Sequence, residues 1–74
     1  MRLTAVMQKR GDWYIGFIKE IPGINSQGKT LEELRNNLKE ATQLILQANA
    51  ELAGKFQGPD TIIEPLDIAV EAVN

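Results

Sequence analysis

The sequence predicts a single small α+β domain in which one long helix covers one face of a four-stranded sheet. Two segments with a period-two pattern and a short segment bounded by turn residues precede residue 30, and a continuous apolar stripe at helical spacing follows it. A further alternating segment lies near the end of the chain. The predicted element order over residues 1–74 is therefore β-β-β-α-β.

The first two strands are expected at residues 2–8 and 13–19, where strong apolar side chains recur at every second position. Gly11 can adopt the positive φ of a three-residue hairpin loop, which we place at residues 9–11. This register puts the strongest apolar residues on one face, which we expect to be the core face: Leu3, Ala5, Met7, Trp13, Ile15 and Phe17. A two-residue loop would shift the pairing by one residue and mix the faces.

The corner that follows is explained by backbone geometry. Pro22-Gly23 ends the second strand, and residues 24–27 form a short third strand that Gly28 terminates. Thr30, with Glu33 three residues later, is a capping box that begins a helix. No phosphate-binding loop is needed to account for these glycines.

From Leu31 the pattern is helical and continues to about Ala53, with Gly54 as the stop signal. The apolar stripe consists of residues spaced three and four apart: Leu34, Leu38, Ala41, Ile45, Ala48 and Leu52. At 1.5 Å per residue the helix is roughly 33 Å long, so its last turns extend beyond a small sheet. Leu46 lies off the stripe, and two readings stay open for it: chance exposure and a protein contact.

A last strand is expected at residues 66–73, after Pro65. A right-handed crossover through the helix would place it beside the first strand, giving a mixed sheet of order 3-2-1-4. The second sheet face then has no cover from this chain and is half apolar. We expect this face to bind a partner, with Tyr14 as its central anchor. The predicted interface residues are four on this face and one on the helix: Thr4, Val6, Tyr14, Ile18 and Leu46.

Composition argues against chemistry at this surface. The chain has no histidine and no cysteine, and its carboxylates do not converge from strand interiors. We therefore expect no enzyme activity, no catalytic residues, no cofactor and no metal, and a carboxylate nuclease is the weakest reading. The net charge of −2 with mixed signs makes direct nucleic-acid binding unlikely. The absence of a long apolar run predicts no membrane association and a cytoplasmic location. One marginal core predicts a homodimer or higher homo-oligomer.

The residues of the strand, corner and cap together resemble a known family. Residues 14–18 (YIGFI), 21–23 (IPG) and 27–33 (QGKTLEE), with Glu40-Ala41 and Pro65, are similar to the N-terminal domain of HicB antitoxins. The sequence departs from that pattern at Lys19-Glu20, Ile24-Asn25 and Lys29, all of which are turn positions. The resemblance implies a partial ribonuclease-H-like fold without its catalytic acids.

The resemblance also implies a function. It predicts an antitoxin of a type II toxin–antitoxin pair that neutralises a HicA-like mRNA-cleaving toxin by steric masking. Many members of that family carry a C-terminal DNA-binding domain, and we expect residues 1–74 to form one HicB-like domain without it. The alternative is a stand-alone oligomeric protein-binding module of the same fold with no cognate toxin. A gene for a small basic protein beside this one would favour the antitoxin.

Overall fold

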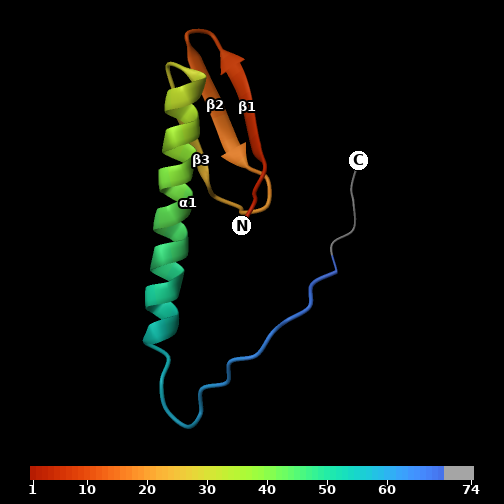
Figure 1. Ribbon diagram of the computed structural model, residues 1–74, viewed down its shortest axis with the longest axis vertical. Coiled ribbons are helices and arrows are strands. Elements are labelled where there is room, and N and C mark those ends of the chain that lie inside the picture. Colours follow the sequence, from red (N-terminus) through yellow and green to blue (C-terminus); the bar gives the residue numbers. More distant parts are fainter. Residues whose placement is uncertain (70–74) are drawn as a thin grey trace.

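A computed structural model describes residues 1–69 and contains three strands followed by one helix (Figure 1). Strand β1 (Ala5–Arg10), strand β2 (Trp13–Ile18) and strand β3 (Asn25–Gly28) form an antiparallel sheet in the order β1-β2-β3. Helix α1 (Leu31–Gly54) packs on one face of this sheet. The predicted positions of these four elements are confirmed to within three residues at each end.

The predicted four-stranded sheet of order 3-2-1-4 is wrong. Within residues 1–69 the fold is β-β-β-α, and residues 66–69 form no strand and lie apart from the sheet (Figure 1). The rest of the predicted last strand, 70–73, lies outside the described residues. An alternating pattern shows that a segment suits a strand. The pattern does not show that pairing with the edge of β1 would outweigh the entropy lost when the connection after α1 is ordered.

The predicted register of the first hairpin is also wrong. Arg10 pairs with Trp13 and Ala5 with Ile18, so the loop has two residues, Gly11 and Asp12. Gly11 has φ 59°, as the first position of a tight type II′ turn requires. The one-residue shift exchanges the two faces of β2, because alternate side chains point to opposite sides of a strand.

Two glycines explain why this register suits the helix. A Cβ on Gly16 would lie 2.9 Å from the Val6 carbonyl oxygen and 3.2 Å from Leu34 Cδ2. A Cβ on Gly28 would lie 2.8 Å from the backbone nitrogen of Leu34. The first turns of α1 therefore pack directly against the backbone of Gly16 and Gly28. The bulky side chains of Ile15 and Phe17, on either side of Gly16, point to the opposite face of the sheet.

The core lies between α1 and the sheet. Its four buried apolar residues come from β2, the following corner and the helix: Ile18, Ile24, Leu34 and Leu38. Thr30 caps the helix as predicted, since its Oγ1 accepts a 3.0 Å hydrogen bond from the Glu33 N–H. Beyond Thr42 the helix runs past the sheet with every residue exposed (Figure 1). The small core thus stabilises only the first half of the helix.

A side-chain hydrogen bond ties the start of the chain to the corner after β2. Glu20 Oε1 accepts a 2.7 Å hydrogen bond from the Thr4 N–H, and the Lys19 N–H donates to the Thr4 carbonyl at 3.0 Å. The bond to the Thr4 N–H is the main reason that the pKa of the Glu20 carboxyl lies below its ordinary value of 4.5. The charged carboxylate therefore stabilises the folded chain.

This bond predicts a specific dependence of stability on pH. Because the folded pKa is lowered, the stabilisation is complete above about pH 4.5 and is lost as pH falls through the folded pKa. Glu20→Gln keeps an acceptor for the Thr4 N–H but removes the titration. We expect its thermal unfolding temperature to fall less steeply on acidification than that of the wild type. The effect should be small because the group is exposed.

The matched control is Glu40→Gln, which removes an exposed carboxylate in the middle of α1. Melting curves followed by circular dichroism from neutral to acidic pH measure all three proteins. An equal change of acid sensitivity in both variants would contradict a special role for the Glu20–Thr4 bond.

Candidate functional site

The sheet face opposite α1 is the candidate site, and no described residue covers it. Three apolar side chains on this face remain substantially in water: Val6 is 40% exposed, Trp13 39% and Phe17 49%. The pairing of Val6 with Phe17 places an aliphatic and an aromatic side chain directly opposite each other. An apolar cross-strand pair of this kind is a compact anchor for a partner.

The centre of this face is a shallow hollow of about 720 Å³. Its lining residues come from all three strands and are mostly apolar or uncharged: Val6, Met7, Gln8, Arg10, Ile15, Gly16, Phe17, Asn25, Ser26 and Gln27. Ile15, which pairs with Gln8 and Gln27, lies at the centre of the strand order. The hollow therefore has an apolar middle and amides at its sides. We call the whole sheet face opposite α1, which includes the hollow and Trp13, the open face.

The electrostatics of the open face are simple. Arg10 is the one charged residue among those lining the hollow, and its Nε donates a 2.9 Å hydrogen bond to Gln8 Oε1. At the hairpin end, Lys29 Nζ lies 5.3 Å from the centroid of the Trp13 ring, within cation–π range. The lining includes no carboxylate. Binding at this face would thus depend on apolar area and amide hydrogen bonds, with positive charge at one end.

The structure divides the predicted interface residues among different surfaces. Val6 lies on the open face, and Thr4 continues its alternation and is exposed. Tyr14 and Ile18 were expected on the uncovered face, but the observed register puts both against the helix, where Ile18 is only 7% exposed. Leu46 is 39% exposed and lines a separate groove between β1 and α1.

Sequence reasoning placed Trp13, Ile15 and Phe17 in the core, and all three lie on the open face instead. The signal that identifies them is the dipeptide Gly11-Asp12, which is typical of a two-residue hairpin loop. Grouping the largest apolar residues on one face assumed that every large side chain is buried within the chain. A protein that binds another through its sheet violates that assumption.

The described residues form neither a metal site nor a membrane-spanning helix. Within residues 1–69, no three histidine, cysteine, aspartate or glutamate side chains lie close enough together to hold a metal ion. In the same part of the chain, the helix lacks the apolar length needed to cross a bilayer. Residues 1–69 do form two hollowed apolar surfaces, the open face and the groove beside β1.

The fold and this surface define a class: a small β-β-β-α protein with one bare, largely apolar sheet face. A UPF0150 protein of Helicobacter pylori is 34% identical over 70 residues, which cover 93% of this chain and 97% of the relative. A UPF0150 protein of Archaeoglobus fulgidus is 31% identical over 64 residues, covering 84% and 93%. One from Synechocystis is 42% identical over 50 residues, covering 66% and 69%.

The chain belongs to the UPF0150 family. The family name states no activity. No family model matches the sequence, and no solved structure matches it significantly.

Proposed function

We propose that this protein is a HicB-like antitoxin that binds a HicA-like mRNA-cleaving toxin in the cytoplasm and neutralises it by steric masking. The observation that carries the proposal is the open face, where Val6, Trp13 and Phe17 are each 39–49% exposed on a rigid sheet. The second support is the sequence resemblance to HicB domains over the strand, corner and helix cap.

Steric masking suits the chemistry of this face. The hollow presents no carboxylate, and its polar side chains are mainly the amides of Gln8, Asn25 and Gln27. Such a surface can cover a toxin without reacting with it or its RNA. Aromatic side chains with amides around them are the usual composition of a protein interface core and its rim.

The charge of the open face limits which toxin surface it can cover. Arg10 and the nearby Lys29 place two positive charges beside the hollow, with Asp12 in the adjacent hairpin loop, and the whole chain carries −2. The proposed contact therefore involves an apolar patch of the toxin, and the acidic residues that attract a basic toxin lie elsewhere on the chain. Long-range charge then affects the rate of encounter more than the affinity.

The alternative function is a stand-alone oligomeric protein-binding module without a toxin. The same open face supports it, because bare apolar area favours any complementary protein. The antitoxin proposal requires a toxin gene beside this gene, and it requires that co-expression of the two gene products restores growth. The binding-module proposal requires neither.

Co-expression with the neighbouring gene product tests the antitoxin proposal. If the neighbour encodes a small basic protein with one central histidine that arrests growth, this chain should restore growth. The purified pair should then form a complex in which mRNA cleavage is inhibited. Arrested growth in spite of full expression of the folded chain would refute the antitoxin and leave the binding module.

A further inference from the structure

A second surface lies between β1 and α1, on the helix side of the sheet. It is a groove of about 640 Å³ whose floor is apolar, with Leu3, Ala5 and Met7 on one wall and Leu38 and Leu46 on the other. The groove exists because α1 lies over β3 and β2 and leaves the helix side of β1 largely uncovered (Figure 1). No described residue beyond Leu46 lines it.

The charged side chains that line the groove are all positive. Three cations line it, Arg2, Arg35 and Lys39, and its lining has no carboxylate. The outer edge of β1 borders the groove and has no strand beside it among residues 1–69. Its backbone N–H and C=O groups are open to the main chain of an extended segment. The groove therefore fits an extended peptide that is apolar and acidic.

The described end of the chain has this chemistry. Residues 61–69 are extended and without regular structure, and their large apolar side chains are almost fully in water: Ile62 is 82% exposed, Ile63 86%, Leu66 79% and Ile68 69%. Glu64 and Asp67 lie among them, and the sequence has no lysine or arginine after Lys55. The segment thus complements the groove both in apolar character and in charge.

We propose that residues 61–69 dock in the β1–α1 groove of a second copy of this chain, so that two copies exchange their ends in a homodimer. The contact is between molecules and adds no strand to the chain's own three-stranded sheet. In the structure, residues 61–69 leave the far end of α1 and do not line the chain's own groove (Figure 1). The inference concerns a different surface from the open face and does not depend on the antitoxin proposal.

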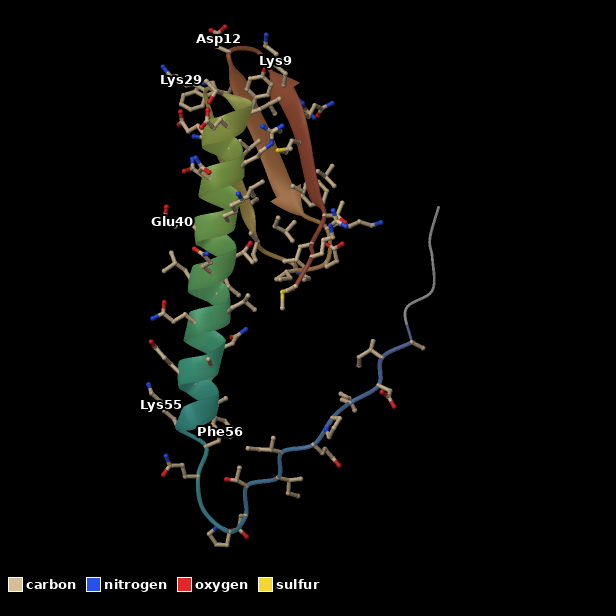
Figure 2. The ribbon with its side chains drawn as sticks, in the orientation of Figure 1. Lys9, Asp12, Lys29, Glu40, Lys55 and Phe56 are labelled. Atoms are coloured by element: carbon tan, nitrogen blue, oxygen red, sulfur yellow. The ribbon has the colours of Figure 1, made fainter. Side chains whose placement is uncertain are left out.

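The far end of α1 favours a second copy over the chain's own groove. Leu44 and Leu52, in the half of α1 that passes beyond the sheet, are 60% and 54% exposed, and Phe56, just after the helix, is 65% exposed (Figure 2). A tail folded back into its own groove would leave these side chains in water. Reciprocal exchange brings the helix end of one copy next to the groove of the other, where both apolar surfaces are covered.

The first test is the oligomeric state of the full chain by analytical ultracentrifugation. We expect a dimer at micromolar concentration. Ile68→Asp should raise the dimer dissociation constant at least about 30-fold, the size expected for one buried interface anchor. The helical circular dichroism should not change, because Ile68 lies outside the core. Asn36→Asp is the control, since it adds the same charge at an exposed position of α1 that does not line the groove.

The second test distinguishes exchange from folding back and uses the absence of cysteine from the sequence. An equimolar mixture of Ala5→Cys and Ile68→Cys chains should form a disulfide-linked dimer under mild oxidation. Asp12→Cys replaces Ala5→Cys as the control, because the hairpin loop lies at the end of the sheet away from the N-terminus (Figure 2). A monomer at all concentrations would overturn the proposal. A dimer whose dissociation constant does not change in Ile68→Asp would also overturn it. So would a disulfide that forms within a single chain carrying both Ala5→Cys and Ile68→Cys but not between the two single variants.

Discussion

Leu34→Ala is expected to remove a large part of the stability of the folded protein. Leu34 is fully buried, and its Cδ2 packs over Gly16, where the sheet has no side chain to fill a cavity. Leucine-to-alanine changes in cores cost about 2–5 kcal/mol, and this site should lie near the upper end because the glycine backbone cannot move in to replace the lost atoms. A chain of this size has only about 4–11 kcal/mol of stability in total.

The matched control is Leu44→Ala on the same helix. Leu44 is 60% exposed, so the same chemical change removes little buried area and gives a residue with higher helix propensity. Urea denaturation at concentrations where the chain is monomeric measures both variants. We expect a loss of at least about 2 kcal/mol for Leu34→Ala and a change within about 0.5 kcal/mol for Leu44→Ala. Equal losses would contradict the placement of the core under the first half of α1.

Local signals in the sequence identified the first three strands and the helix, but not which face of the hairpin is buried. Thr30 and Glu33 fixed the start of the helix, and Gly54 its end, because caps depend on neighbours within four residues. Which side chains of the hairpin face the helix depends on the length of its loop. The predicted loop has three residues, 9–11, and the observed loop has two, Gly11 and Asp12. Turn chemistry decides between them, and the Gly-Asp pair outweighs the tendency to group large apolar residues.

The sequence predicted that the candidate site is an uncovered sheet face, but it did not predict which residues form that face. The sequence indicated that one helix cannot cover both faces of its sheet, and the open face agrees with this. Gly16 and Gly28 explain which face of the sheet the helix covers, because they let the helix backbone approach closely. This close approach joins elements that are distant in the sequence, so no local sequence pattern predicts it. The segment near the end of the chain failed for a similar reason, because alternation at Leu66 and Ile68 does not identify a pairing partner.

Phe17→Glu is expected to weaken binding of the proposed toxin at the open face without unfolding the protein. Phe17 is 49% exposed opposite Val6, so a carboxylate there remains solvated in the free chain. In a complex the same carboxylate would be buried against apolar atoms without a counter-charge. Loss of an aromatic anchor with an added unpaired charge should weaken binding to the toxin by at least about 2 kcal/mol, roughly 30-fold in Kd.

The adjacent residue gives the opposite expectation. Ile18 is 7% exposed on the helix side, and Ile18→Glu places a carboxylate in the core. This variant should lose its cooperative thermal transition and its helical circular dichroism, because burying an unpaired charge costs several kcal/mol. Loss of binding in Phe17→Glu together with loss of folding in Ile18→Glu is therefore expected only if β2 has the register with a two-residue loop.

Asn36→Glu completes the comparison, because it adds the same charge at an exposed position on α1, away from the open face. Calorimetric titration with the purified toxin and thermal melts of the three variants give the readouts. Under the predicted three-residue loop the roles would be reversed, with Phe17→Glu unfolding the chain and Ile18→Glu abolishing binding. A folded Phe17→Glu chain that binds the toxin as tightly as Asn36→Glu would show that the open face is not the toxin-binding surface.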